Sequence, residues 1–140
     1  MKLLLVDDSR AIQIANQRAL EKVGYEVTCA SDGEEALRLA EMQTFDLILL
    51  DLMLPKVPGL EVLKRLKGNR KTAEIPVVVL SSLSERNSIK LIDAGADAYL
   101  EKSTLMPEHG VNLLPQMLED IVCRIHRRQG IAFTDVHTSH

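Results

Sequence analysis

Five short segments of the 140-residue chain carry the hydrophobic pattern of β-strands. Three of them, residues 3–6, 47–50 and 77–80, are nearly unbroken apolar runs of strand length. Such runs are typical of strands that are covered on both faces, as in a parallel sheet. Two weaker candidates are residues 25–30, where apolar and polar residues alternate as in a strand nearer a sheet edge, and residues 97–100.

The segments between these runs show the three-to-four-residue apolar spacing of amphipathic helices. The predicted apolar faces consist of Ile12, Ala15, Ala19 and Val23; of Ala36, Leu37 and Ala40; of Leu60, Leu63 and Leu66; of Ile89 and Ile92; and of Leu114, Met117, Leu118, Ile121, Val122 and Ile125. Ser9 is a good N-cap for the first helix, and glycines follow or close several of them.

Strands and helices alternate along the whole chain, which favours a parallel sheet with helices on both faces. Right-handed crossovers limit the arrangements, and the common doubly wound order for five strands is 2-1-3-4-5. We therefore predict an α/β fold in which residues 1–128 form one domain. Residues 129–140 are polar and are expected to be a C-terminal tail or the start of a linker.

Charge, cysteine content and the N-terminus narrow the class of protein. A formal net charge of −3 does not indicate a nucleic-acid or membrane partner. The apolar run at the N-terminus is too short for a signal peptide or a membrane span. Cys29 and Cys123 lie far apart and show no metal-binding or redox spacing. A reduced, cytoplasmic location is the simplest interpretation.

Acidic residues stand at the ends of two strands that are predicted to be neighbours. Asp7 and Asp8 follow the first strand and Asp51 ends the third, and the order of the strands reverses between these two, where ligands bind in such sheets. At about 4 Å and an effective dielectric constant near 20, each pair of carboxylates repels by roughly 4 kcal/mol. A retained proton or a bound cation must relieve this repulsion. Oxygen ligands suit Mg²⁺, and the backbone carbonyl of Met53 is a further candidate ligand.

A hydroxyl and an ammonium group are expected at the same edge of the sheet. Ser81 ends the fourth strand and Lys102 follows the fifth. Mg²⁺ and a lysine together neutralise phosphoryl oxygens, and a carboxylate can accept a phosphoryl group. These residues predict phosphoryl transfer to Asp51, in which the protein mainly positions charges.

The sequence resembles the receiver domains of two-component response regulators. The matching pieces are LLLVDDS, LILLDLMLP, PGLEVLKRLK, IPVVVLSS and DAGADAYLEKS, which occur in the family's order on the expected strands. The resemblance covers about residues 2–128 and implies the flavodoxin-like receiver fold. Ser103 departs from the family's pattern, because a proline usually follows the lysine.

The resemblance also implies roles for the residues at the strand ends. Asp51 would accept a phosphoryl group from a sensor histidine kinase or a histidine phosphotransfer protein. Asp7 and Asp8 would hold Mg²⁺ together with Asp51 and the Met53 carbonyl. The protein would then be a signalling module that catalyses only its own phosphoryl transfer and dephosphorylation, not an enzyme acting on other substrates.

Three more residues would act on the phosphorylated state by the same resemblance. Lys102 would pair with the phosphoryl group, and the Ser81 hydroxyl would turn toward it. Tyr99 would be the aromatic switch residue, buried or exposed according to the state of Ser81.

The partner surface implied by the resemblance comprises the helix around residues 89–92, the strand 97–100 and the last helix. It would contact a downstream protein target or a fused output domain, or form a phosphorylation-dependent homodimer. Too few residues follow Arg128 for a DNA-binding domain, so we expect no direct nucleic-acid binding and no membrane contact by this segment. The chain would be a stand-alone regulator or the receiver part of a larger one.

Two alternatives remain open at this level. A pseudo-receiver would keep the fold and bind partners without phosphorylation. A phosphatase with an aspartyl nucleophile usually has a second acid two residues on, where this chain has Met53.

Overall fold

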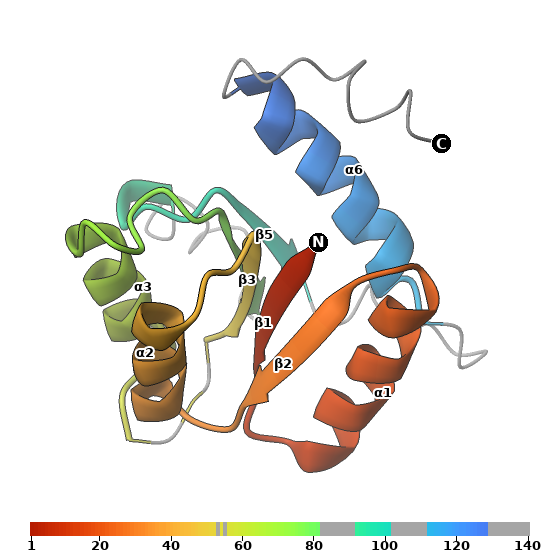
Figure 1. Ribbon diagram of the computed structural model, residues 1–140, viewed down its shortest axis with the longest axis horizontal. Coiled ribbons are helices and arrows are strands. Elements are labelled where there is room, and N and C mark those ends of the chain that lie inside the picture. The colour runs from red at the N-terminus through yellow and green to blue at the C-terminus, as the bar shows by residue number, and fades with distance from the viewer. Residues whose placement is uncertain (53, 55, 82–91, 102–111, 129–140) are drawn as a thin grey trace.

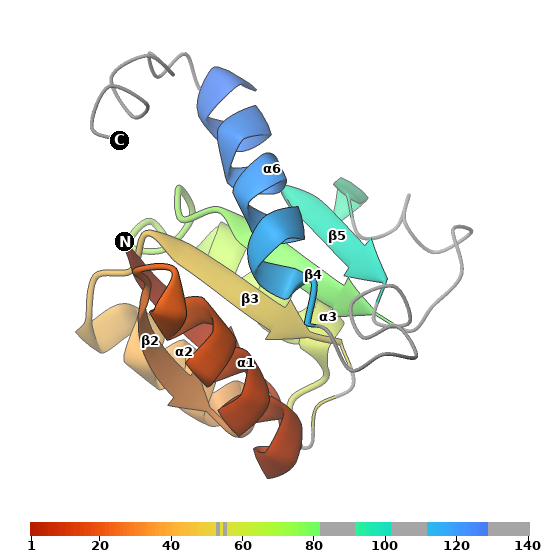
Figure 2. The ribbon, with the colours of Figure 1, turned by 90° about the vertical axis from the view of Figure 1, so that its right-hand side faces the viewer.

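The computed structural model describes residues 1–52, 54, 56–81, 92–101 and 112–128. They form a five-stranded sheet of order β2-β1-β3-β4-β5, in which every neighbouring pair of strands is parallel (Figures 1 and 2). This result confirms the predicted α/β fold and strand order. The elements are β1 (Lys2–Val6), α1 (Arg10–Lys22), β2 (Glu26–Ala30), α2 (Gly33–Met42), β3 (Leu47–Asp51), α3 (Gly59–Gly68), β4 (Val77–Ser81), β5 (Ala98–Glu101) and α6 (Leu114–Arg128).

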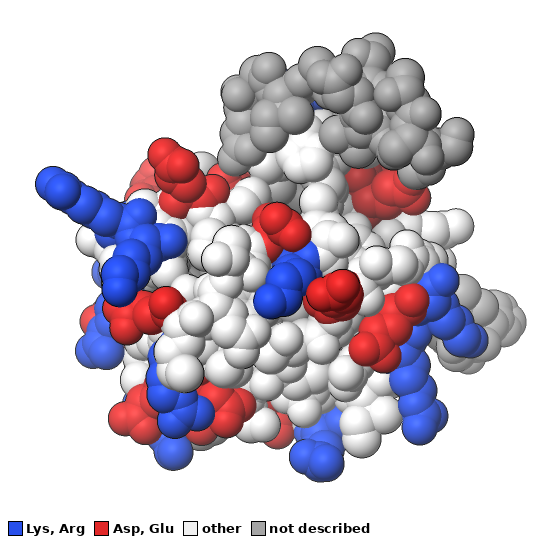
Figure 3. All heavy atoms as spheres, in the orientation of Figure 1, with Lys and Arg blue, Asp and Glu red and all other residues white. Residues whose placement is uncertain are grey.

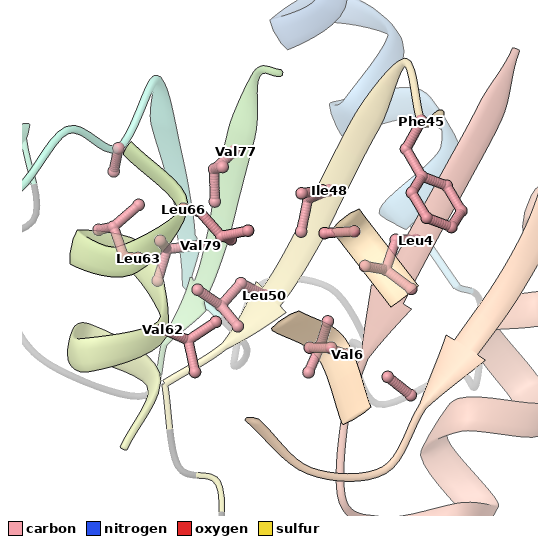
Figure 4. Close-up of a cluster of buried hydrophobic side chains, with 14 residues drawn as sticks. Leu4, Val6, Phe45, Ile48, Leu50, Val62, Leu63, Leu66, Val77 and Val79 are labelled. Atoms are coloured by element: carbon pink, nitrogen blue, oxygen red, sulfur yellow. The ribbon is translucent and has the colours of Figure 1, made fainter. Parts of the chain in front are cut away.

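One face of the sheet is covered by α2 and α3. Alternate strand residues point to this side, so that one buried cluster joins the sheet to both helices (Figure 4). Its strand members include Leu4, Val6, Ile48, Leu50, Val77 and Val79, and its helix members include Ala36, Ala40, Val62, Leu63 and Leu66. The apolar faces predicted for the second and third helices are thus confirmed, with Leu37 and Leu60 packed at the margin of the cluster.

The opposite face is covered by α1 and α6 (Figure 2). The intervening strand residues, such as Leu3, Leu5 and Leu49, form a second buried cluster there. The last helix contributes the stripe that its periodicity predicts, with Leu114, Leu118, Ile121 and Ile125 buried. Because both faces of β1, β3 and β4 are covered, these strands have no polar face until they reach their carboxyl ends.

The apolar face predicted for the first helix is wrong. Ile12 and Val23 are 45% and 59% exposed, whereas α1 turns Gln13, Asn16 and Leu20 toward the sheet. The two polar side chains are tolerated there because they are hydrogen-bonded: Gln13 donates to backbone carbonyls, and Asn16 accepts from Asn112. A search for apolar periodicity does not find a buried face that is built partly of amides.

The strand 25–30 lies at the sheet edge as β2, and most of it is half-buried, as its alternating pattern predicts. The predicted helix around Ile89 lies mostly outside the described residues, as do residues 129–140. None of the described helices combines the length and the apolarity that crossing a bilayer requires.

Candidate functional site

The strand register brings the predicted acids together at the carboxyl end of the sheet. Val6 and Leu50 are the last pair between β1 and β3. The residues that follow them, Asp7 and Asp51, therefore lie at the same level of the sheet. Carboxylate oxygens of Asp7, Asp8 and Asp51 all lie within 4.8 Å of one another. Asp7 and Asp51 are each 1% exposed, while Asp8 is exposed to solvent. The three acids therefore form one cluster that is buried on one side and open on the other.

Backbone hydrogen bonds hold Asp7 in this cluster. Its N–H donates to the Ala30 carbonyl over 3.0 Å, and its Oδ1 accepts from the Ser9 N–H over 2.9 Å. The Asp7 carbonyl in turn accepts from Gln13 Nε2 over 3.1 Å. Ser9 also caps α1, as predicted, because its side chain accepts from the Ile12 N–H. The start of α1 and the acid are therefore fixed by the same short segment.

The chain that leaves Asp51 is held close to the start of α3. The Gly59 N–H donates to the Leu52 carbonyl over 3.1 Å. A Cβ atom at Gly59 would lie 2.5 Å from Leu52 Cα and 2.7 Å from the Asp51 carbonyl oxygen, closer than real contacts allow. Glycine is therefore required at this position for the helix to begin directly beside the buried acid.

Lys56, between β3 and α3, reaches the start of α2. Lys56 adopts a left-handed backbone conformation with φ of 66°, and its Nζ lies 3.4 Å from Asp32 Oδ2 and 3.8 Å from Glu34 Oε2. Asp32 caps α2 by accepting from the Glu35 N–H over 2.8 Å. This bond, followed by the charge of Lys56, holds the pKa of Asp32 below its ordinary value against the opposing effect of burial. An ion pair thus ties the loop after Asp51 to the neighbouring helix.

Of the other predicted site residues, the structure describes Ser81 and Tyr99. Ser81 ends β4, is 2% exposed, and pairs in register with Glu101, the residue before Lys102. Tyr99 lies in β5 and is half-buried, beside a cavity of about 510 Å³ that Ile121 and Arg124 of α6 also line. Lys102 and Met53 lie outside the described residues, as does Ser103.

The described part of the site has the chemistry of a hard-cation site. At 4.8 Å, the upper limit of these separations, one pair of carboxylates repels by roughly 3.5 kcal/mol at an effective dielectric constant near 20. Three carboxylates offer the all-oxygen ligand set that Mg²⁺ prefers, and the solvent side leaves positions for water or a phosphoryl oxygen. The donor set therefore fits Mg²⁺.

The family model for the response regulator receiver domain matches residues 3–112. The chain belongs to this family. The receiver domain is a signalling domain of two-component systems, not an enzyme of the ordinary kind.

This receiver domain is similar to parts of two longer curated proteins. It is 41% identical over 120 residues to a gliding motility regulatory protein of Myxococcus xanthus, covering 85% of this chain and 15% of that protein. It is 43% identical over 102 residues to a transcriptional regulatory protein for alkaline phosphatase synthesis of Bacillus subtilis (strain 168), covering 72% of this chain and 42% of that one. The chain spans less than half the length of these curated relatives.

Among solved structures, the domain resembles the receiver domain of a sensor histidine kinase from Pseudomonas aeruginosa PAO1. The TM-score is 0.73 at 28% identity, with 90% of this chain and 94% of that chain covered. That structure is described as having a magnesium ion coordinated in its active site cleft.

Sequence reasoning missed Gln13, which contacts the backbone of Asp7. The available signal was the spacing of Gln13, Asn16 and Leu20, which places all three on one side of a helix. These residues predict the buried side of the helix only if an amide is accepted as a buried residue.

Proposed function

We propose that this receiver domain accepts a phosphoryl group on Asp51 and changes its binding to other proteins in response. The observation that carries the proposal is the cluster of Asp7, Asp8 and Asp51 within 4.8 Å at the carboxyl end of the sheet. Asp51 stands on a rigid, buried strand, so its carboxylate is held in one position for in-line attack on phosphorus.

The reaction transfers one phosphoryl group between two side chains. An Asp51 oxygen forms a bond to the phosphorus of a phosphohistidine, and the bond between phosphorus and the imidazole nitrogen breaks. A bound Mg²⁺ would neutralise charge on the phosphoryl oxygens. Asp7, Asp8 and Asp51 would hold this ion, together with the backbone carbonyl of Met53.

Further residues complete the proposed switch. Lys102 pairs with the phosphoryl group, and Ser81 donates its hydroxyl to it. Tyr99 follows the state of Ser81 and changes the surface formed by β5 and α6. The new phosphate contacts then shift the population between two conformations of this surface. Hydrolysis of the acyl phosphate by the domain itself returns it to the resting state.

The proposed partners are proteins. A sensor histidine kinase or a histidine phosphotransfer protein donates the phosphoryl group, in the cytoplasm. A downstream target, a fused output domain or a second copy of the chain receives the signal at the surface of β5, α6 and the helix around residues 89–92. On the face of the molecule in Figure 3, described basic and acidic side chains are intermixed, which supports protein partners over a nucleic acid.

Intact mass measured after incubation with acetyl phosphate tests this function. We expect one phosphoryl adduct on the wild-type protein in the presence of Mg²⁺, and none without Mg²⁺ or in Asp51→Asn. Asp46→Asn is the matched control, because Asp46 precedes the same strand at its other end and accepts from the Lys2 N–H, which an asparagine oxygen can also do.

The outcomes separate the alternatives. An adduct in Asp46→Asn but not in Asp51→Asn supports Asp51 as the acceptor. A folded wild-type protein that gains no adduct with Mg²⁺ present contradicts the proposal and favours a pseudo-receiver that binds partners without phosphorylation.

A further inference from the structure

The side chain of Gln13 joins the first turns of α1 to the ends of two strands. It is 6% exposed, and its Nε2 donates to the carbonyl of Asp7 over 3.1 Å and to the carbonyl of Ala30 over 3.1 Å. Both partners are acceptors, so the amide nitrogen and not the amide oxygen must face them. Gln13 therefore uses both of its N–H donors on strand-end backbone.

These two bonds act at the point where Asp7 leaves the sheet. Val6 and Ala30 form the last pair of the ladder between β1 and β2. The Ala30 carbonyl accepts from both the Asp7 N–H and Gln13, and the Asp7 carbonyl accepts from Gln13. Gln13 thus continues the hydrogen bonding of the two strands for one residue beyond their ladder, and that residue is a member of the acid cluster.

The orientation of the Asp7 carboxylate depends on this backbone. The carboxylate is 1% exposed, and its Oδ1 accepts from the Ser9 N–H, two residues further along. A buried side chain on such a short tether moves when its own peptide units rotate. Loss of the Gln13 bonds frees the peptide unit after Asp7 and leaves its carbonyl without that donor.

We propose that Gln13 is a positioning residue for the metal site. By holding the carbonyls of Asp7 and Ala30, it keeps the Asp7 carboxylate where it and Asp51 bind the same Mg²⁺. This inference rests on the proposed function of the acid cluster. Removal of a residue that orients a metal ligand commonly lowers the metal affinity about 10–100-fold.

A purely structural role for Gln13 is the alternative, and Asn16 provides the matched control. Asn16 follows on the same side of α1, is 7% exposed, and also carries an amide. Its Oδ1 accepts from Asn112 Nδ2 over 2.9 Å, so it joins α1 to the segment before α6 and not to the acid cluster. Removing either amide removes a buried hydrogen bond, but only Gln13 acts on Asp7.

The test compares Gln13→Met with Asn16→Leu, two apolar replacements of similar size to the native residues. Mg²⁺ binding is measured by isothermal titration calorimetry, and the melting temperature is measured without Mg²⁺. We expect both variants to melt at lower temperature. The Kd for Mg²⁺ should rise about tenfold in Gln13→Met and stay within about twofold of wild type in Asn16→Leu.

Equal affinities in the two variants would overturn the inference while leaving the metal site intact. Absence of Mg²⁺ binding by the wild-type protein would overturn the metal site and the inference together.

A second measurement uses only the wild-type protein, so it does not depend on the folding of a variant. In a titration followed by nuclear magnetic resonance, Mg²⁺ should shift the side-chain NH₂ signals of Gln13 in step with the backbone amides of Asp7 and Ser9. The side-chain NH₂ signals of Asn16 should stay in place. Gln13 signals that do not respond to Mg²⁺ would contradict the coupling.

Discussion

Carboxylates lie at both ends of the β-sheet, but the side chains around them differ. At the amino end, Asp97 Oδ2 lies 2.9 Å from Lys67 Nζ and accepts from the Val77 N–H over 2.8 Å. Lys67 also donates to the carbonyls of Ala73 and Ile75. This carboxylate is matched by an opposite charge and by N–H donors within the fold, so it joins the end of α3 to the starts of β4 and β5.

At the carboxyl end, the acids face one another. Asp7, Asp8 and Asp51 lie within 4.8 Å, although like charges at that distance repel. Repulsion among the three carboxylates opposes their joint ionisation, and a cation bound among them would relieve it.

The largest expected effect is at the amino end. Asp97→Ala removes the carboxylate beside Lys67, whose side chain is 18% exposed, and the acceptor of the Val77 N–H. We expect the free energy of unfolding to fall by about 2–3 kcal/mol, because the half-buried Lys67 ammonium loses its carboxylate and keeps only two carbonyl acceptors, and the Val77 N–H loses its acceptor. Urea unfolding measures this loss.

The control for this prediction is the metal site at the other end of the sheet. The affinity of the folded Asp97→Ala protein for Mg²⁺ should equal that of wild type. A large loss of Mg²⁺ affinity in this variant would mean that the two ends are coupled and that the contrast between them fails.

The next effect concerns the two ends of α3, which lie at the two ends of the sheet. Gly59→Ala places a Cβ against Leu52 and the Asp51 carbonyl, so we expect a loss of about 1–3 kcal/mol in stability and slower phosphorylation of Asp51. Gly68→Ala, at the other end of the helix, meets no atom within 4 Å and should be neutral or stabilising by up to about 1 kcal/mol. Chemical unfolding and the rate of adduct formation test both, and equal losses in the two variants would contradict the prediction.

Much of the fold could be predicted because the strands are covered on both faces. Continuous apolar runs such as residues 47–50 cannot be half-exposed strands, and their alternation with helices leaves few topologies. The acid cluster followed from the topology, since the carboxyl ends of neighbouring parallel strands meet at one edge. Asp7 and Asp51 were therefore predictable as neighbours without any knowledge of their contacts.

The features that the sequence did not predict depend on hydrogen bonds. Unlike apolar faces, hydrogen-bond partners do not recur at regular spacings along the sequence. Gln13 and Asn16 are buried because each has a polar partner, and those partners lie far away in the chain or on its backbone. The Lys67–Asp97 pair joins residues 30 positions apart and was not predicted for the same reason. Ile12 and Val23, which periodicity assigns to the core, are exposed because the amides occupy the inner side of α1.

A third prediction reverses the sign of the first. Asp7→Asn keeps an oxygen that can accept from the Ser9 N–H but removes one of three like charges. Without Mg²⁺, we expect the variant to be more stable than wild type by about 1–2 kcal/mol, which is the repulsion that remains after the favourable contacts of the Asp7 carboxylate are deducted. The stabilisation that Mg²⁺ gives to the wild-type protein should be lost.

Asp97→Asn is the matched control, because the same change at the amino end should destabilise the protein. Urea unfolding with and without Mg²⁺ measures both variants. If Asp7→Asn is instead less stable than wild type without Mg²⁺, repulsion does not dominate the acid cluster and the contrast between the two ends is wrong.

The smallest effect concerns Asp32, an acid at the carboxyl end that pairs with a lysine, as Asp97 does at the amino end. Its pKa is held below the ordinary value by the Glu35 N–H and by Lys56, so the fold favours its ionised form. The resulting stability is fully present above the unfolded pKa near 3.9 and is lost as pH falls through the lower folded pKa. Asp32→Asn keeps a helix-capping oxygen without the charge. Near neutral pH, the free energy of unfolding of the wild-type protein should exceed that of this variant by less than about 1 kcal/mol. The difference should vanish at acid pH. Urea unfolding of both proteins across this pH range tests it. A difference that is independent of pH would show that the cap geometry, and not the charge, distinguishes Asp32 from the acids of the cluster.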